Sequence, residues 1–198
     1  MLKRIFDIIF SILGLIISLP AIIILSIWIS MDSPGGIFYL QERIGKDFKP
    51  FQLFKFRSMY SGSDKKGLLT VGGKDNRITR SGYFIRKYKL DELAQLINVL
   101  KGDMSIVGPR PEVKKYVDLY NEEQKRVLSI KPGITDYASI EYYNENEILE
   151  KSSNPEKTYI EEIMPHKLSL NLKYIEEQNL VTDFKIILKT IKRIIIRN

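Results

Sequence analysis

The chain has 198 residues, and its 31 Lys and Arg residues against 24 Asp and Glu residues give a formal net charge of +7. It contains no cysteine, which excludes disulfides, thiolate metal sites, iron–sulfur clusters and cysteine nucleophiles. Its single histidine, His166, leaves no second imidazole for a His-based metal site and argues against a Ser-His-Asp triad. The remaining chemistry is that of carboxylates, hydroxyls, Arg and Lys clusters and oxygen-bound cations.

The positive charge is concentrated in two parts of the chain. Residues 42–115 hold 17 basic and 8 acidic residues, and residues 183–198 hold 5 basic residues and 1 acidic residue. Residues 116–182 carry a net charge of −6. Basic segments attract polyanions, so the candidate partners are nucleic acid, a phosphorylated small molecule and an anionic membrane.

Residues 8–30, near the start of the chain, form a run of 23 uncharged residues, most of them Ile and Leu. A helix of this length would reach about 35 Å, enough for the hydrocarbon core of a bilayer. A cleaved signal peptide is the alternative, but the run is long and no small-residue cleavage site precedes the basic body. We therefore expect residues 1–32 to form a retained membrane segment.

Pro20 lies in the middle of this segment, two residues after Ser18. Proline removes an N–H group and clashes with the carbonyl four residues earlier, so we expect a kink. Basic residues flank both ends, and the positive-inside rule places both flanks in the cytoplasm. A helix that bends and returns satisfies that rule, whereas an ordinary kinked span does not. Charge alone leaves the two arrangements equally open.

Two short strands are expected after the membrane segment. Residues 37–40 form a short apolar run, and residues 51–57 alternate apolar and polar side chains. The alternation places Lys55 and Arg57 on the polar face of the second strand. Residues 61–76, rich in Gly, Ser and charge, predict a loop.

Helices are expected to fill most of the remaining chain up to residue 182. Ser81 and Asp91 are candidate N-caps, and Gly102 is a candidate helix end. Residues 33–182 are thus predicted to form one α/β (α+β) domain with few short strands. The expected helices are residues 82–88, residues 92–101 with Leu93, Leu96, Ile97 and Leu100 as the buried stripe, residues 113–130 and residues 166–179.

The C-terminal tail, residues 183–198, has the pattern of a basic amphipathic helix. Six apolar residues fall on one face: Phe184, Ile187, Leu188, Ile191, Ile194 and Ile195. Lys and Arg residues occupy the other faces, as in helices that lie in an anionic membrane interface. A helix packed on the protein's own core has the same pattern, and the two alternatives remain open.

An acidic pair, Asp91 and Glu92, follows the basic residues Arg86, Lys87 and Lys89 at an expected helix start. The unpaired N–H groups and the positive dipole end of a helix attract anions there, phosphate above all. An ionised carboxylate beside a divalent cation and a phosphate can attack phosphorus. An N-cap with an acidic first turn explains the same two residues without any function. The pair alone therefore does not distinguish a catalytic site from an ordinary helix start.

A second motif follows ten residues later. A short apolar strand within residues 102–108 leads into Pro109, Arg110 and Pro111. The two prolines hold the backbone, so the guanidinium is presented to a phosphate or a base edge at low entropic cost. A rigid turn with a solvated arginine is the alternative. The order and spacing of the two motifs carry more information than either one alone.

The run KLDELAQLINVLKGDMSIVGPRPE, with KFRSM before it and IKPGIT after it, resembles the bacterial sugar-transferase family of monotopic phosphoglycosyl transferases. The resemblance covers almost the whole chain and matches the small single-function members. It implies transfer of a sugar-1-phosphate from a UDP-sugar to a polyprenyl phosphate, here undecaprenyl phosphate, with release of UMP. This is the first committed step of glycoconjugate assembly, and an N-acetylated or further modified amino sugar is the expected donor sugar.

The resemblance also implies roles for individual residues. Asp91 matches the nucleophile that carries a covalent phosphosugar, and Glu92 matches its partner at the Mg²⁺ site, so both are expected metal ligands. Substrate binding is expected at the positions that match the family's phosphate-holding arginine, uridine-end motif and basic strand: Arg86, then Pro109, Arg110 and Pro111, then Lys55 and Arg57.

In the family the N-terminal helix is re-entrant and breaks at a Ser-Pro pair, which the resemblance places at Ser18 and Pro20. It implies a monotopic protein on the cytoplasmic face of the bacterial inner membrane. Three departures stand out: Leu19 separates Ser18 from Pro20, Ala94 replaces a common proline, and residues 136–139 differ from the usual Gly-Leu-Ala-Gln. The last change weakens any transfer of sugar identity.

Two other functional classes are consistent with part of the pattern. A membrane-tethered nucleic-acid-binding protein would use the basic segment against phosphates and bases. A non-catalytic scaffold would dock on membrane lipid through residues 1–30 and 184–197. Neither class needs the Asp91–Glu92 pair, so we expect a membrane-lipid partner and no nucleic acid. A homodimer through residues 116–182 is left open.

Overall fold

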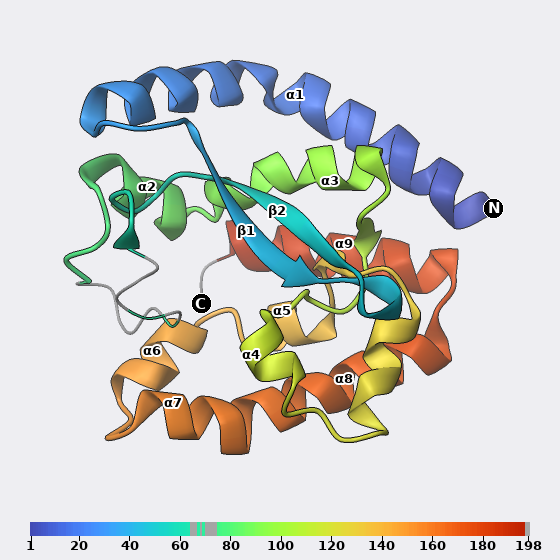
Figure 1. Cartoon of the computed structure of the whole chain (residues 1–198). Coiled ribbons are helices and arrows are strands. Elements are labelled where there is room, and N and C mark those ends of the chain that lie inside the picture. The colour runs from blue at the N-terminus through green and yellow to red at the C-terminus, as the bar shows by residue number, and fades with distance from the viewer. Residues whose placement is uncertain (64–66, 68, 70–74, 197–198) are drawn as a thin grey trace.

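The computed structural model describes residues 1–63, 67, 69 and 75–196. Helix α1 (Leu2–Asp32) arches over one side of the molecule, and the helix α3 (Gln95–Lys101) lies directly beneath it (Figure 1). Mixed helix and sheet make up the rest, as the sequence predicts. The predicted loop at residues 61–76 falls largely outside the described residues.

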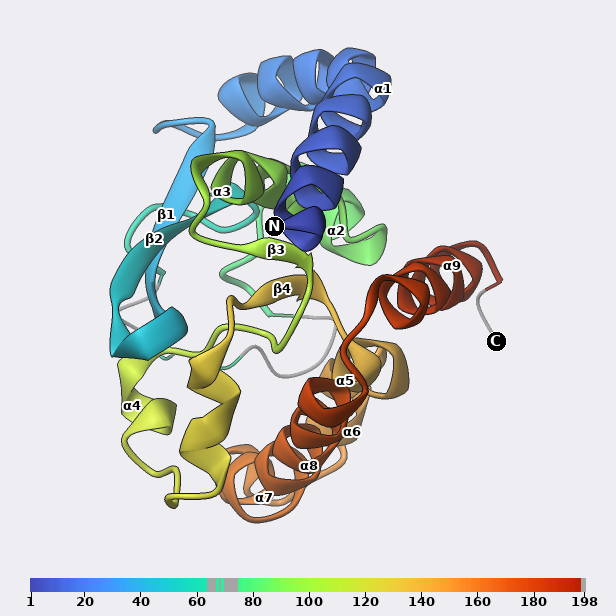
Figure 2. The same ribbon diagram turned by 90° about the vertical axis from the view of Figure 1, so that its right-hand side faces the viewer.

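Helix α1 runs through Pro20 without ending. The Ser18 hydroxyl donates to the Gly14 carbonyl at 2.6 Å, a local bond typical of serine within an apolar helix. The helix bends in its middle, as both views show, and its two limbs do not fold back on each other as an antiparallel pair (Figures 1 and 2). The predicted kink is therefore confirmed, and residues 2–32 form one continuous bent helix. The re-entrant position of this helix in a membrane stays a prediction.

Both ends of α1 are bonded to the body of the protein. Near its start, the buried Asp7 carboxylate accepts from the Ser105 hydroxyl at 2.9 Å and the Ile106 backbone N–H at 3.0 Å. At its end, Asp32 accepts from the backbone and the hydroxyl of Ser81, both at 2.8 Å. Length and composition make α1 the one helix among the described residues that could cross a membrane.

Two small sheets hold the middle of the chain. Strands β1 (Phe38–Ile44) and β2 (Pro50–Phe56) form an antiparallel hairpin in which Tyr39 pairs with Lys55. Strands β3 (Ser105–Val107) and β4 (Gly133–Thr135) pair in parallel. Both strands predicted before residue 60 and the short apolar strand before Pro109 are confirmed. The extension of β1 to Ile44 was missed because Gln41, Glu42 and Arg43 are three consecutive polar residues, which interrupt the apolar run.

The helix starts around the acidic pair differ from the prediction. Helix α2 (Arg80–Lys87) is capped by Thr79, whose hydroxyl accepts from the Gly82 N–H at 3.0 Å, so Ser81 is not the cap. Ser81 is instead bonded to Asp32. Asp91 caps nothing either: it lies in a 3-10 turn, η3 (Leu90–Ala94), that precedes α3.

The predicted stripe of α3 is only half-buried, because this helix lies between α1 and strand β2 and polar residues face the strand. The buried face consists of Gln95, Asn98 and Val99. Gly102 ends the helix in the left-handed conformation with φ of 95°, as predicted. Asn98 is fully buried, and its side chain donates to the Gln52 carbonyl at 2.7 Å and accepts from the Phe54 N–H at 2.9 Å.

Substitution of Asn98 by alanine is expected to lower the free energy of unfolding by about 2–4 kcal/mol. Two partly buried backbone groups of β2 lose the partner that Asn98 provides, and each unmet group costs about 1–3 kcal/mol. Chemical or thermal denaturation of the detergent-solubilised protein measures the change. Glu122→Ala is the control, because this side chain is 91% exposed and a change within about 0.5 kcal/mol is expected. Equal effects of the two substitutions would contradict the assignment.

Residues 113–130 do not form one helix but two short ones, α4 (Lys114–Val117) and a 3-10 helix, η4 (Gln124–Ser129). A hydrophobic core lies between α4, η4 and α8 (Met164–Glu177), which confirms the helix predicted at 166–179. Three short helices connect β4 to α8, and a π-helical turn and a short 3-10 turn complete the described elements. Their bounds are α5 (Tyr137–Glu141), α6 (Glu145–Glu150), α7 (Pro155–Thr158), η5 (Tyr159–Ile163) and η1 (Lys46–Phe48).

The tail forms helix α9 (Leu180–Ile195), capped by Asn179. Figure 2 shows α9 beside the body, apart from α1 and next to α5. Its predicted apolar face is largely exposed: Phe184, Leu188, Ile191 and Ile195 are 47%, 51%, 48% and 74% exposed. The core contact is made by the fully buried Ile186. Packing on the protein's own core therefore does not cover this face of α9.

Candidate functional site

Asp91 and Glu92 lie in the turn between α2 and α3. Lys89, immediately before this turn, adopts the left-handed conformation with φ of 55°, which reverses the chain after α2. The turn packs against β2, the strand that carries Lys55. Asp91 is 8% exposed, so the structure places this carboxylate inside the molecule.

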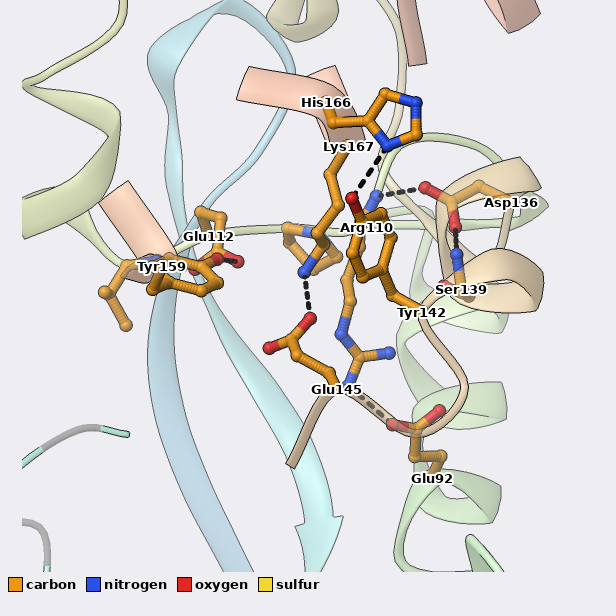
Figure 3. Close-up of polar contacts among 12 residues, drawn as sticks. Glu92, Arg110, Glu112, Asp136, Ser139, Tyr142, Glu145, Tyr159, His166 and Lys167 are labelled. Atoms are coloured by element: carbon orange, nitrogen blue, oxygen red, sulfur yellow. Dashed lines mark hydrogen bonds and ion pairs between the residues drawn. The ribbon is translucent and has the colours of Figure 1, made fainter. Parts of the chain in front are cut away.

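Glu92 is paired with Arg110 of the Pro-Arg-Pro motif. The Arg110 guanidinium donates to the Glu92 carboxylate at 2.5 Å. The Arg110 backbone N–H donates to the buried Asp136 at 3.3 Å, and Asp136 also caps α5 through the Ser139 N–H at 2.6 Å. Figure 3 shows this chain of contacts from Glu92 to Ser139. The motif is thus fixed at both its side chain and its backbone.

The two flanking prolines are held by their carbonyls. The Pro109 carbonyl accepts from the Gly133 N–H at 2.9 Å, and the Pro111 carbonyl accepts from Arg43 at 2.9 Å. A Cβ on Gly133 would lie 2.1 Å from the Gly108 nitrogen, so only glycine permits this close approach of the two chains. The prolines therefore build the rigid support of Arg110.

The surrounding charges and burial shift the pKa values of Asp91 and Glu92 in opposite directions. Burial opposes ionisation of Glu92, but the charge of Arg110 and its hydrogen bond outweigh it and lower the pKa of Glu92 to about 2. Burial and the neighbouring charge of Glu92 raise the pKa of Asp91, against the opposite effects of Lys55 and Arg86. Such a divergence between neighbouring titratable groups is typical of catalytic sites.

A further set of charged side chains, which sequence reasoning missed, continues from Arg110. Lys167 donates to Glu145 at 2.8 Å, and Tyr159 donates to Glu112 at 2.6 Å. Arg43 donates to Glu112 at 3.1 Å. Figure 3 shows Glu145 and Lys167 beside Arg110. These residues lie far apart in the chain and belong to no local motif, so no sequence signal singles them out.

Two cavities meet at Asp91. The first, which we call the α9 cavity, measures about 350 Å³ and lies between the η3 turn, α5, α6 and α9. The second, the hairpin cavity, measures about 300 Å³ and lies between the β1–β2 hairpin and residues 57–63. Lys55, Arg86 and Asp91 border both cavities. The structure thus brings these three predicted residues together, with Glu92 and Arg110 on the α9 side.

The α9 cavity has an apolar border beside its charged one. Leu93 contributes to it from η3, Leu96 from α3 and Ile194 from α9. Leu96 lies against α1, where a Cβ on Gly14 would approach it to 3.1 Å. The border therefore joins the two helices whose apolar side chains are most exposed.

Arg57 is bonded away from the acidic pair. Its guanidinium donates to the carbonyls of Ile29, Ser33 and Pro34 at 3.2, 2.7 and 2.9 Å, which satisfies the C-terminal end of α1. It also lines the hairpin cavity. Its contacts support a role in attaching α1, and the predicted substrate contact stays a prediction. Ser18 and Pro20 lie in α1, outside the described linings of both cavities.

Exposed aromatic residues on α2 extend the apolar surface of α1. The rings of Trp28 and Phe84 are 5.4 Å apart, and those of Phe84 and Tyr88 are 4.6 Å apart. All three side chains are between 39% and 43% exposed. Aromatic residues of this kind are enriched where a protein meets the membrane–water interface. Sequence reasoning missed this cluster because Trp28 lies in α1, far along the chain from Phe84 in α2 and from Tyr88, which follows α2.

Asp91 and Glu92 are also the residues to test as a metal site. Among the described residues, no group of three or more His, Asp or Glu side chains is arranged to hold a metal ion. Mg²⁺ commonly uses one or two carboxylates and completes its shell with water and substrate phosphates. An adjacent carboxylate pair, in which burial and the charge of Glu92 together raise the pKa of Asp91, fits that donor set.

Comparison with known proteins identifies relatives along the whole chain. The sequence matches the family described as bacterial sugar transferase over residues 1–197. An Aeromonas hydrophila protein named UDP-N-acetylgalactosamine-undecaprenyl-phosphate N-acetylgalactosaminephosphotransferase is 34% identical over 98% of this chain and 44% of its own length. An Escherichia coli (strain K12) UDP-glucose:undecaprenyl-phosphate glucose-1-phosphate transferase is 35% identical over 96% of this chain and 39% of its own length.

A relative of similar size exists as well. The Bacillus subtilis (strain 168) sugar transferase EpsL, named as uncharacterized, is 36% identical over 98% of this chain and 88% of its own length. This chain therefore spans less than half of the Aeromonas and E. coli relatives and most of EpsL. The match along the whole chain settles its family: it belongs to the bacterial sugar transferases.

Proposed function

We propose that this chain transfers a sugar-1-phosphate from a UDP-sugar to undecaprenyl phosphate through a covalent intermediate on Asp91. The observation that carries the proposal is the position of Asp91, buried at the junction of two cavities and surrounded by Lys55, Arg86 and the Glu92–Arg110 pair. Phosphoryl transfer needs alignment and charge neutralisation more than special functional groups, and this site supplies both.

The reaction has two displacements at one phosphorus atom. The Asp91 carboxylate attacks the phosphorus next to the sugar, and the bond to the bridging oxygen breaks so that UMP leaves. A phosphate oxygen of the acceptor lipid then attacks the same phosphorus, and the bond to Asp91 breaks. The carboxylate is regenerated, and the lipid carries the sugar through a diphosphate.

The side chains around Asp91 have distinct tasks in this scheme. Lys55 and Arg86 hold the donor phosphates, and the Glu92–Arg110 pair is rigid because Pro109 and Pro111 are held by their carbonyls. Asp91 and Glu92 would hold Mg²⁺, which neutralises charge on the phosphates when bound. A raised pKa makes Asp91 a more basic nucleophile than an ordinary carboxylate, and the surrounding cations keep it ionisable.

We further propose that the protein sits in one leaflet of the bacterial inner membrane, with the body on the cytoplasmic face. Both ends of α1 are bonded to the same polar body, through Asp7 and Asp32, which supports an arrangement with both ends on one side of a membrane. The bend in the middle of α1 would let this part of the helix enter the bilayer and return. The exposed apolar faces of α1 and α9 and the aromatic cluster with Trp28 would set the depth.

The donor sugar is proposed to be an N-acetylhexosamine. The Aeromonas relative is named for N-acetylgalactosamine. A second Bacillus subtilis protein, 48% identical over 62% of this chain, has the provisional name undecaprenyl-phosphate N-acetylgalactosaminyl 1-phosphate transferase. Glucose, named for the E. coli relative, is the second candidate.

The proposal is tested by release of UMP from UDP-N-acetylgalactosamine, UDP-N-acetylglucosamine, UDP-glucose and UDP-galactose, with purified protein, undecaprenyl phosphate and Mg²⁺. We expect release that depends on the lipid, favours an N-acetylated donor and stops on addition of EDTA. Release with none of these donors, or release that does not need the lipid, would contradict the proposal.

Lys55 gives a pH-dependent prediction. Burial, with the charges of Arg110 and Arg43, lowers the pKa of Lys55 to about 8. Only the ammonium form attracts the donor phosphates, so kcat/KM for the donor is expected to fall as the pH rises through about 8. Lys55→Arg keeps its charge across that range and should flatten the alkaline side of the profile. The same alkaline fall in both proteins would show that another group controls it.

A further inference from the structure

The junction at Asp91 has a consequence for how a donor lies in the site. A UDP-sugar has a nucleoside on one side of its diphosphate and a sugar on the other. Lys55, Arg86 and Asp91 border both cavities, so a diphosphate held there can extend one half of the donor into each. The question is which half enters which cavity, and it arises only if the proposed function is correct.

Stereochemistry links the nucleotide with the acceptor lipid. Both displacements on phosphorus are in line, so the leaving oxygen of UMP lies opposite Asp91 in the first step. The incoming oxygen of the lipid phosphate lies opposite Asp91 in the second step. Because Asp91 is the nucleophile in one step and the leaving group in the other, UMP and the lipid phosphate use the same position. The sugar oxygen stays bonded to phosphorus throughout and points elsewhere.

The lipid reaches that position through the α9 cavity. Its border carries Leu93, Leu96 and Ile194, which connect the apolar faces of α1 and α9. The hairpin cavity is lined instead by the hairpin and residues 57–63, away from α9. The nucleotide must therefore also occupy the α9 cavity, before the lipid. We infer that the sugar of the donor binds in the hairpin cavity and is recognised there by Gln41.

The hairpin provides a prepared surface for this. Tyr39, Gln41 and Arg43 alternate along β1 with exposed residues, and all three line the hairpin cavity. Tyr39 is paired with Lys55 on β2, so the surface begins beside Asp91 and continues to Gln41. One face of the hairpin thus leads from the phosphates to the sugar.

Gln41 is held in a fixed orientation. Its side-chain oxygen accepts from Arg43 Nε at 3.1 Å and Nη2 at 2.8 Å. Arg43 is itself bonded to the Pro111 carbonyl at 2.9 Å and to Glu112 at 3.1 Å. With its oxygen engaged by Arg43, the amide of Gln41 offers N–H donors to a ligand. Hydroxyl groups of a hexose, or the carbonyl of an N-acetyl group, are acceptors of that kind.

The test compares the kinetics of different donors in two single variants, one with a substitution in each cavity. Gln41→Glu keeps an oxygen for Arg43 and removes the amide donor, whereas Asn146→Ala changes a residue that lines only the α9 cavity of these two. We expect Gln41→Glu to change the ratio of kcat/KM between UDP-N-acetylgalactosamine and UDP-glucose about tenfold, the usual effect of one hydrogen bond to a substrate. The inhibition constant for UMP should stay within about twofold of its value in the unmodified protein. Asn146→Ala should weaken inhibition by UMP and leave the ratio unchanged.

Binding without turnover separates this inference from the proposed function. In an Asp91→Asn background, calorimetric titration with UDP and with each UDP-sugar measures what the sugar adds to affinity. We expect Gln41→Glu to remove that increment and Asn146→Ala to preserve it. The inference is overturned if Gln41→Glu weakens UDP and UDP-sugars equally, if Asn146→Ala changes sugar preference, or if the sugar adds no affinity. Failure of the proposed function would appear separately, as no lipid-dependent UMP release by the unmodified protein.

Discussion

Substitution of Asp91 by asparagine is expected to lower the rate of sugar-1-phosphate transfer by a factor on the order of 10⁴ or more, because an amide cannot form the covalent intermediate. Asparagine has nearly the same shape and removes a buried carboxylate whose pKa is already raised, so the fold should be retained. Lipid-dependent UMP release measures the rate.

The controls for this variant are properties that do not depend on catalysis. Expression, thermal stability and recovery in the membrane fraction should match those of the unmodified protein, because the buried Asp91 is not part of the exposed apolar faces of α1 and α9 that would anchor the protein. Release of UMP at more than about a hundredth of the normal rate would contradict Asp91 as the nucleophile, because loss of a catalytic nucleophile costs far more than that.

Substitution of Arg110 by alanine is expected to have the second largest effect, a loss of about 10²–10³ in kcat/KM. It leaves the partly buried Glu92 carboxylate without the partner that donates to it at 2.5 Å. Removal of one electrostatic partner from an active site commonly costs about 10²–10³ in rate. The pKa of Glu92, now held at about 2, should rise, so the acid side of the pH–rate profile should move to higher pH.

Arg126→Ala is the matched control, because Arg126 is exposed on η4, outside the described linings of both cavities. Its kcat/KM and pH profile should be unchanged. Arg110→Lys keeps the charge and loses the planar fork, so an intermediate loss is expected. An Arg110→Ala profile with its acid side in the original place would argue that Arg110 does not control Glu92.

The sequence predicts the framework of the site well where the signal is local. A 3.6-residue period identifies α3, α8 and α9, alternation identifies β2, and the spacing of the Asp91–Glu92 pair from Arg110 indicates one site. The structure then places Glu92 and Arg110 in contact. Such motifs carry their own geometry, since the prolines and the turn fix the backbone around them.

Prediction from the sequence fails where tertiary contacts determine the position of a residue. Asp is a residue type typical of N-caps, but Asp91 caps no helix: Thr79 caps α2, and the acidic pair lies in a 3-10 turn that precedes α3 and packs against β2. Asn98 lies outside the predicted apolar stripe of α3, yet it is buried because its side chain bonds the backbone of β2. Long-range partners of this kind leave no period or spacing in the sequence.

The same holds for the outer part of the site. Glu145 and Lys167 are separated by 22 positions, and Arg43 and Glu112 by 69, so neither pair is visible as a motif. Polar residues on a half-exposed strand, such as Gln41, look like ordinary surface residues until the hairpin is folded. Only the structure shows that this face of the hairpin lines a cavity bordered by Asp91.

The central claim is that Asp91 carries the sugar-1-phosphate between the two displacements. The most direct measurement is the intact mass of the purified protein mixed with Mg²⁺ and the UDP-sugar that supports UMP release, without the acceptor lipid. We expect a mass increase equal to one sugar phosphate, located on the peptide that contains Asp91, absent in Asp91→Asn and lost on addition of undecaprenyl phosphate. UMP release that requires both substrates together, with no adduct on Asp91, would contradict the account in favour of direct transfer.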